Sequence, residues 1–262
     1  MSKVALLVAL VACSHREPAA PEPPPSEPLP YSPRHGFMLD ADALITVVAE
    51  EWGSTQVQVR SWSRHAPRGM VDEGADLGVR PWAPDGDAFD AVIGRGGLAW
   101  GIGLHGEGAP AGHTGPVKRE GDGASPAGAF RLGQAFGFEP APGHRVLDEQ
   151  TECVDDPKSA SYNEIVERTG SADWTSSEHM RSVGEYALGA FVEHNPKRAP
   201  GAGSCIFLHV WDGPDSTTVG CTAMPRERLE QLLDGLAKNT VLVQLPKAEY
   251  EALRKPWGLP AQ

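Results

Sequence analysis

Apolar and polar residues alternate in short runs along most of this chain. Residues 44–48 (LITVV) form a β-branched run, and residues 55–62 (TQVQVRSW) place Val57 and Val59 on one face between polar neighbours. This period of two predicts two β-strands joined through residues 51–54. Further short runs predict strands at residues 88–93, 127–132, 186–192, 205–210 and 240–245. Many short strands predict a mainly β fold, either a sandwich or a barrel.

A clear helical period occurs near the C-terminus, in residues 225–237. The apolar stripe at i, i+3, i+4 and i+7 consists of Leu229, Leu232, Leu233 and Leu236. Pro225 suits the first turn of a helix, where its missing N–H is not needed. The pattern predicts one prominent α-helix that follows Cys221 directly. At that position the helix dipole would favour a thiolate.

The first 12 residues have the pattern of a secretory signal peptide. Lys3 precedes an apolar run at residues 4–12, which is too short to span a hydrocarbon core of ~30 Å. Residues 10–13 (LVAC) resemble a bacterial lipobox, in which Cys13 would be lipidated and become the mature N-terminus. Ser14 follows it, and a residue other than Asp there favours the outer membrane. The alternative is an ordinary signal peptide that is cleaved nearby.

Residues 18–30 (PAAPEPPPSEPLP) are dense in proline and poor in large apolar residues. Such a segment favours extended polyproline II, or a disordered spacer, and would reach roughly 40 to 50 Å from an anchor. The predicted organisation is a signal peptide at 1–12, a stalk at 13–39, a catalytic domain at 40–247 and a C-terminal tail at 248–262. Within the domain, residues 133–184 are rich in Gly, Pro and polar residues and predict a long loop-rich insertion near the mouth of the active site.

The charge of the chain excludes one class of partner. Its formal net charge is −12, and its basic residues are dispersed. Binding to nucleic acid needs clustered Lys and Arg that neutralise phosphates, so we expect no nucleic-acid partner. The 40% of hydrophobic and 22% of charged residues are ordinary for a soluble globular domain.

The candidate chemistry lies in residues 204–224. His209 ends an apolar strand, a Gly/Pro/Asp loop follows, and Gly220 precedes Cys221 in a tight turn. A cysteine nucleophile needs a base within reach and backbone N–H groups where an oxyanion forms. Because side chains alternate along a strand, His209 shares a face with Cys205 and Phe207, opposite the aliphatic face. The alternative is a buried structural thiol and a histidine without a chemical role.

The same segment resembles the L,D-transpeptidases of the YkuD type, which carry a histidine, a loop and Ser/Thr-His-Gly-Cys. Thr218, Gly220 and Cys221 match that ending, whereas Val219 replaces the internal histidine and Ala223 stands where arginine or asparagine is common. The loop is also shorter than the usual pattern. A branch of the family resembles the chain over about residues 40 to 246. The matching motifs, in order, are residues 94–101 (GRGGLAWG), 117–130 (VKREGDGASPAGAF), and 153–157 (CVDDP) with Tyr162 and Asn163.

The resemblance implies a YkuD-type β-sandwich and a set of roles. Cys221 would attack the carbonyl of the L-residue in an L,D-peptide bond of a peptidoglycan stem peptide, and His209 would take its proton. The carbonyl of Val210 would orient the imidazole, and the N–H groups of Gly220 and Cys221 would hold the oxyanion. No cofactor and no metal are implied. The candidate substrate-binding residues are Trp211, Thr218, Asn195 and Glu178.

Three other functions remain open at this point. The first is an L,D-carboxypeptidase, or a hydrolase of peptidoglycan attachments, with the same nucleophile. The second is a non-enzymatic lipoprotein that binds peptidoglycan through a degenerate site. The third is a zinc site formed by Cys205, His209 and Cys221, for which no fourth ligand is evident.

The remaining two cysteines allow two interpretations. Cys153 and Cys205 would form a structural disulfide in an oxidising periplasm. Equally, Cys153 belongs to the family-like CVDDP motif and would line the pocket as a free thiol.

Overall fold

The computed structural model describes residues 38–64, 81–236 and 239–262. The predicted signal peptide, Cys13 and the predicted stalk up to residue 37 lie outside the described residues. The first two predicted strands are confirmed as β1 (Ala43–Ala49) and β2 (Gln56–Ser63), an antiparallel pair in which Val47 lies opposite Val59. The turn between them contains residues 51–54, as the alternation predicted.

Eight strands of the described part of the chain close into a ring, here called the barrel. Their order is β1-β16-β8-β13-β14-β15-β4-β2, and β2 pairs back to β1. The bounds are β4 (Phe89–Val92), β8 (Ser125–Gly137), β13 (Leu188–Val192), β14 (Phe207–Val210), β15 (Thr222–Met224) and β16 (Thr240–Pro246). The mainly β prediction is confirmed. The pairing gives a closed barrel instead of the two facing sheets of the predicted sandwich, because β15 pairs with β4 and so joins the two edges.

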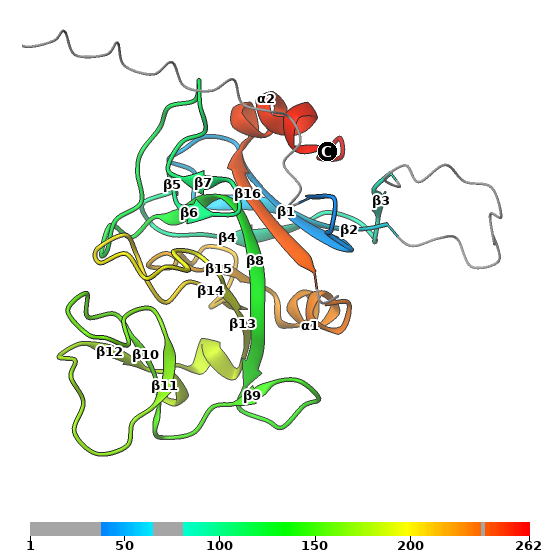
Figure 1. Cartoon of the computed structure of the whole chain (residues 1–262). Coiled ribbons are helices and arrows are strands. Elements are labelled where there is room, and N and C mark those ends of the chain that lie inside the picture. The colour runs from blue at the N-terminus through cyan, green and yellow to red at the C-terminus, as the bar shows by residue number, and fades with distance from the viewer. Residues whose placement is uncertain (1–37, 65–80, 237–238) are drawn as a thin grey trace, which may run out of the picture. The chain divides into compact units, whose positions relative to one another are not determined.

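Short strands attach to this framework. β3 (Ala83–Pro84) pairs with β2, while β5 (Leu98–Trp100) and β9 (Arg145–Val146) pair with β8. β6 (Ile102–Gly103) and β7 (Gly106–Glu107) form a separate hairpin. β8 is the longest strand and runs along the whole side of the barrel in Figure 1.

Two α-helices pack on the barrel. The predicted helix is α1 (Arg226–Asp234), with Leu229, Leu232 and Leu233 buried. It begins only after β15, so Cys221 precedes a strand and not the helix, and this part of the prediction was wrong. The second helix, α2 (Lys247–Trp257), was predicted as a tail. Its buried residues Tyr250, Leu253 and Trp257 recur at i, i+3 and i+7, which is the apolar stripe of a helix.

All seven residues of β16 are buried. In Figure 1, α2 lies at the end of β16, from which the chain continues directly into the helix. The burial of every residue of β16 explains why residues 240–245 form an almost continuous apolar run instead of alternating. No helix among the described residues has the length and apolar character needed to cross a membrane.

The predicted insertion at residues 133–184 is more ordered than a loop. The end of β8 takes up its first residues, and a three-stranded sheet follows in the order β11-β10-β12. These strands are β10 (Thr151–Val154), β11 (Ile165–Glu167) and β12 (Ser177–His179). Two 3-10 turns, η2 (Met180–Ser182) and η3 (Gly184–Ala187), lead back to β13. We call this part the small sheet; it lies beside the lower end of the barrel in Figure 1.

A disulfide joins the small sheet to the barrel. Cys153 of β10 is bonded to Cys205, which directly precedes β14, and the two Cα atoms are 6.0 Å apart. The structure therefore favours the first of the two interpretations of these cysteines. It also removes Cys205 as a zinc ligand, and no group of three or more His, Cys, Asp or Glu side chains within the described ranges could hold a metal ion.

The disulfide should contribute measurably to stability, because it closes a loop of 52 residues. We expect the Cys153→Ala/Cys205→Ala variant to lose about 2–4 kcal/mol of unfolding free energy, since the unfolded chain regains the freedom of that loop. Denaturant unfolding under oxidising conditions measures the loss, and reduction of the wild type by a phosphine should reproduce it. Equal stability of the variant and the oxidised wild type would contradict the expectation.

Candidate functional site

His209 lies in the middle of the sheet, where its ring is held by its own strand. On β14 it pairs with Gly189 of β13 and with Ala223 of β15. Its Nδ1 lies 2.7 Å from the carbonyl oxygen of Val210, so Nδ1 carries the proton and donates it to that carbonyl. Burial lowers the pKa of His209, whose side chain is only 8% exposed. The imidazole is therefore neutral at pH 7, and its Nε2 is free of that proton and able to accept one.

The turn that carries Cys221 is fixed by hydroxyl groups. Thr218 Oγ1 accepts a hydrogen bond from the N–H of Gly220 at 3.1 Å and donates to the carbonyl of Cys221 at 2.6 Å. Ser125 Oγ donates to the same carbonyl at 2.9 Å. Gly220 has a φ of 149°, and a Cβ there would lie 3.2 Å from the carbonyl oxygen of Ala124. A glycine is required at this position for both reasons.

The thiol of Cys221 points into the protein. Its Sγ accepts the N–H of Phe207 at 3.3 Å and lies 3.6 Å from the carbonyl oxygen of Cys205, to which it donates. Cys221 is 4% exposed. The face of β14 that carries Phe207 and His209 therefore does not face open solvent. It packs against a second apolar cluster that includes Phe136 and Tyr186.

Burial raises the pKa of the Cys221 thiol, and the negative charge of Glu178 raises it further. The N–H of Phe207, the charge of Lys118 and the hydroxyl of Tyr186 act in the opposite direction but do not outweigh the burial. The dipole of α1 does not help, because α1 begins at Arg226, roughly 16 Å along an extended chain from Cys221, and the effect is confined to the first turn. The sequence-based expectation of a lowered thiol pKa is therefore wrong for the free protein. The proton has to be removed within the site.

Cys221 and His209 line one small pocket of about 170 Å³. Trp211 and Thr218, both predicted to bind substrate, lie in the same lining, and so does Val219. Val219, which the resemblance aligns with a histidine of the L,D-transpeptidases, is 61% exposed. The chain thus presents an apolar side chain at this pocket.

One of the two predicted oxyanion donors is already engaged. The N–H of Gly220 donates to Thr218 Oγ1. The N–H of Cys221 makes no hydrogen bond within the part of the chain that is described. The arrangement therefore offers one open backbone donor at Cys221, the candidate nucleophile.

Two predicted substrate-binding residues are not part of the pocket lining. Asn195 is 0% exposed, and its amide bonds the backbone of Ala199 and Gly203. These bonds hold the loop at residues 195–203, and they engage both polar atoms of the Asn195 side chain. Glu178 lies behind the pocket, where its carboxylate accepts a hydrogen bond from Tyr186.

The other nearby histidines are occupied. In His194, Nε2 donates to the carbonyl of Ala202 at 3.0 Å and Nδ1 accepts the N–H of Ile102 at 3.3 Å. Burial lowers its pKa to about 4, so it is neutral and structural. His179 is largely exposed and pairs with Glu152 at 3.2 Å. Neither histidine lines the pocket of Cys221.

Residues of the segments 117–130 and 162–163 contact the chain just before β14, the strand that carries His209. Asn163 Oδ1 accepts the N–H of Cys205 at 2.9 Å. The carboxylate of Glu120 accepts hydrogen bonds from the hydroxyls of Tyr162 and Ser204. Lys118, which is buried, pairs with Asp122 at 2.5 Å. These residues hold Cys205 and the entry to β14 in place and do not line the pocket.

Of the pocket residues that the sequence analysis did not name, three lie outside the segment 204–224: Val183, Glu185 and Tyr186. Tyr186 was assigned to a strand, whereas it lies in η3, and its ring is 5.4 Å from that of His209. The sequence did show an aromatic residue just after the predicted insertion, and this was the one sign that Tyr186 could line the pocket. Nothing local indicated that the insertion folds back onto Cys221.

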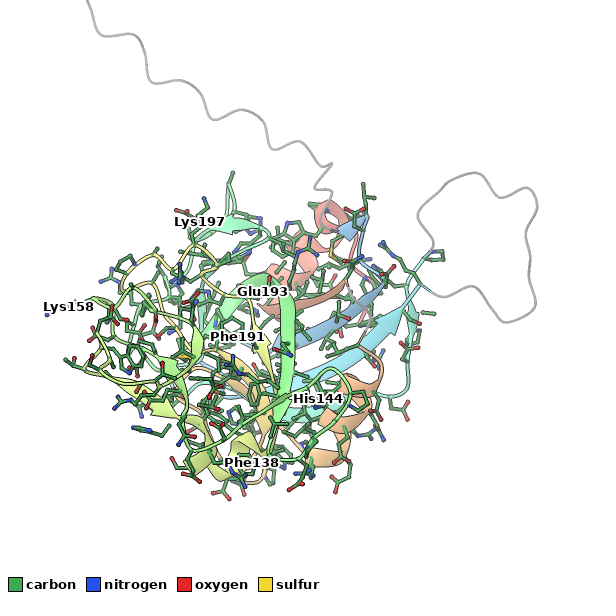
Figure 2. The ribbon with its side chains drawn as sticks, turned by 60° about the horizontal axis from the view of Figure 1, so that its bottom comes forward. Phe138, His144, Lys158, Phe191, Glu193 and Lys197 are labelled. Carbon is green, nitrogen blue, oxygen red and sulfur yellow. A yellow bond between two sulfur atoms is a disulfide. The ribbon has the colours of Figure 1, made fainter. Side chains whose placement is uncertain are left out.

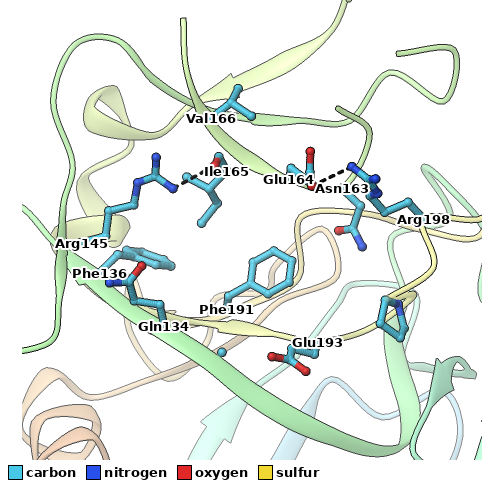
Figure 3. Close-up of a pocket in the computed structure, with 12 residues that line it drawn as sticks. Gln134, Phe136, Arg145, Asn163, Glu164, Ile165, Val166, Phe191, Glu193 and Arg198 are labelled. Carbon is cyan, nitrogen blue, oxygen red and sulfur yellow. Dashed lines mark hydrogen bonds and ion pairs between the residues drawn. The ribbon is translucent and has the colours of Figure 1, made fainter. Parts of the chain in front are cut away.

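A larger cavity of about 720 Å³ lies between the barrel and the small sheet (Figure 3). Phe191 and Glu193, which Figure 2 labels beside β8, line it together with Phe136. Its two arginines are paired: Arg145 donates to the carbonyl of Ile165, and Arg198 bonds Glu164 at 2.7 Å. Its lining contains neither cysteine nor histidine, so the candidate nucleophile and base both belong to the smaller pocket.

The candidate site thus consists of a neutral, oriented imidazole and a buried thiol in one pocket. Comparisons of the chain with protein-family models, with curated proteins and with solved structures found no match.

Proposed function

We propose that this protein is a cysteine acyltransferase of the L,D-transpeptidase type that acts on peptidoglycan stem peptides. The observation that carries the proposal is the orientation of His209: Nδ1 is committed to the carbonyl of Val210, and the ring lines the pocket that Cys221 also lines. A base held in this way can accept the thiol proton through Nε2 only.

The reaction would proceed in two steps. In the first, the proton of Cys221 passes to His209 Nε2 while the sulfur bonds the carbonyl carbon of the L-residue, whose π electrons move onto oxygen. When they return, the C–N bond breaks, and His209 gives its proton to the departing amine of the D-residue. In the second, an acceptor amine attacks the thioester and gives a proton to His209 Nε2, the S–C bond breaks, and His209 passes that proton to the Cys221 sulfur. The N–H of Cys221 would donate to the oxyanion in both steps.

The size of the pocket limits what it holds. At about 170 Å³ it is smaller than the 300–1,000 Å³ typical of sites that enclose a whole ligand. It therefore suits the scissile bond and one adjoining residue, with Trp211 as one wall, while the rest of a stem peptide lies outside. The site uses no cofactor or metal in this scheme.

Assignment to the YkuD-type fold is part of the same proposal. Its support is the order of the motifs along residues 94–163 and 204–221, together with their convergence on Cys205 and β14. The strand pairing by itself supports only a mainly β barrel.

Muropeptide analysis tests the proposal. Incubation of the purified protein with tetrapeptide muropeptides should yield cross-linked products and free D-amino acid. Removal of the terminal residue without cross-links would identify an L,D-carboxypeptidase instead. Retention on peptidoglycan without any product would identify a non-enzymatic binding protein.

We also propose a periplasmic location with a lipid anchor at Cys13, on the outer membrane. The wild type should partition with membranes and incorporate a palmitate label, because residues 10–13 resemble a lipobox. Cys13→Ser should lose the label, whereas Cys221→Ala, as a matched cysteine control, should keep it. A soluble, unlabelled wild type would refute the anchor and leave the enzymatic proposal untouched.

A further inference from the structure

Tyr186 and Glu178 form a polar pair beside the pocket that Cys221 lines. The hydroxyl of Tyr186 donates to Glu178 Oε2 at 2.5 Å. Tyr186 is 6% exposed and lines the pocket together with Cys221 and His209. A buried tyrosine that satisfies its hydroxyl with a carboxylate beside a nucleophile is more than packing, because a phenylalanine would fill the same space without that cost of desolvation.

The ring of Tyr186 is held from several sides. It makes edge contacts with Phe136 at 6.0 Å and with Phe207 at 5.2 Å, besides the one with His209. Its hydroxyl therefore has little freedom beyond rotation of the O–H bond. That hydroxyl also lowers the pKa of the Cys221 thiol, because an O–H group can donate to a thiolate.

Glu178 is tied to Cys221 by a second route. On β12 it pairs with Cys153 of β10, and Cys153 is disulfide-bonded to Cys205. The carbonyl of Cys205 in turn lies 3.6 Å from Cys221 Sγ. The small sheet thus holds Glu178 in a fixed place relative to the thiol, through a covalent bond and a strand pairing.

We propose that Tyr186 and Glu178 control the ionisation of Cys221, with Tyr186 as the hydrogen-bond donor to the thiolate and Glu178 as the residue that positions this hydroxyl. In the resting thiol state the Tyr186 proton is directed to the Glu178 carboxylate. When Glu178 takes up a proton, it donates to the Tyr186 oxygen, and the Tyr186 O–H turns to the sulfur. Apart from the O–H bond that Glu178 forms with a proton from solvent, only these hydrogen bonds change. For the reaction itself, this inference rests on the proposed function.

The charges around the pair agree with this exchange. Burial raises the pKa of Glu178 to about 7, and the charges of Asp155 and Glu120 add to the effect. Glu178 therefore changes its protonation near neutral pH. Lys118 is the cation that favours the thiolate of Cys221, and Glu185 is a further anion near Tyr186. An ionised Glu178 opposes the thiolate, whereas the hydroxyl of Tyr186 supports it.

The two residues should therefore act on Cys221 in opposite directions. Tyr186→Phe removes a donor to the thiolate, so alkylation of Cys221 by iodoacetamide should move to higher pH and slow by about 10-fold at pH 7, which corresponds to about one pKa unit. Glu178→Gln removes the opposing charge, so the profile should move to lower pH and the rate at pH 7 should rise. The full-length protein is used with its disulfide intact, and the peptide that contains Cys221 is followed by mass spectrometry.

Tyr250→Phe is the matched control, because the hydroxyl of Tyr250 bonds the carbonyl of Pro260, in a part of the fold remote from the pocket lining. It should keep the wild-type profile. Wild-type profiles for both Tyr186→Phe and Glu178→Gln, or shifts of both in the same direction, would overturn the inference. Because Glu178→Gln keeps the shape of the side chain, it remains informative if thermal melting shows that Tyr186→Phe is unfolded.

Acylation by a carbapenem separates this inference from the proposed function. Opposite shifts in alkylation without a carbapenem adduct would uphold the control of Cys221 and refute the transpeptidase proposal. A carbapenem adduct without opposite shifts would support the transpeptidase proposal and refute the control of Cys221 by Tyr186 and Glu178.

Discussion

Cys221→Ala should abolish both the carbapenem adduct and the turnover of muropeptides. Cys221 is the one free cysteine of the described residues, and it shares a pocket with an oriented histidine. Removal of a nucleophile that acts as part of a catalytic unit costs on the order of 10⁶-fold in rate. Intact mass spectrometry after incubation with a carbapenem, and chromatography of muropeptides, measure the two effects.

The control for this result is Cys153→Ala/Cys205→Ala. This variant lacks the disulfide but keeps the proposed nucleophile, so it should retain at least part of both proposed activities. Thermal melting of Cys221→Ala should show a folded protein, since alanine leaves only a small cavity at the sulfur. Turnover by Cys221→Ala at the wild-type rate would mean that the nucleophile lies elsewhere.

His209→Ala should slow acylation by about 10²-fold or more while the protein stays folded. In the wild type, the raised pKa of the buried thiol leaves almost no thiolate at neutral pH, so proton transfer to a neutral imidazole is needed for attack. Without His209, alkylation of Cys221 by iodoacetamide should move to higher pH. Single-turnover acylation and the pH profile of alkylation measure these changes.

His209→Gln is a useful companion variant, because it fills more of the space of the ring without supplying a base of suitable pKa. It should be as slow as His209→Ala but more stable. If both variants alkylate with the wild-type pH profile, His209 is a structural strand residue. Another residue would then have to act as the base. Neither His194 nor His179 is a candidate, because His194 bonds the carbonyl of Ala202 and His179 pairs with Glu152.

The local parts of the fold were predictable from the sequence. The alternation around Val57 and Val59 and the leucine stripe of α1 arise from the burial of one face of a strand or helix, and both appear where they were predicted. Closure of the barrel was not predictable in this way. It depends on the pairing of Ala223 with Val92, which lie far apart in the sequence. The apolar pattern of each strand does not indicate which strand it pairs with.

In the candidate site too, the local arrangement was predictable and the long-range contacts were not. His209, the carbonyl of Val210 and Cys221 come from one continuous segment, so the motif predicted their relation. Tyr186 and Glu178 reach the thiol only because the insertion folds back and is bonded through Cys153. The predicted lowering of the thiol pKa failed because Cys221 is buried and because β15 separates it from α1, and no local residue pattern indicated either feature.

The most direct measurement is the location of the acyl group after the wild type reacts with a carbapenem. Trypsin should release residues 199–226 as one peptide, which contains both Cys205 and Cys221, so fragmentation must assign the modified cysteine. A phosphine should be used to reduce the disulfide, because an added thiol would cleave a thioester. If Cys221 is the nucleophile, the mass of one carbapenem is found on Cys221 and Cys205 is unmodified. An adduct on any other residue, or no adduct with folded protein, would contradict the proposal.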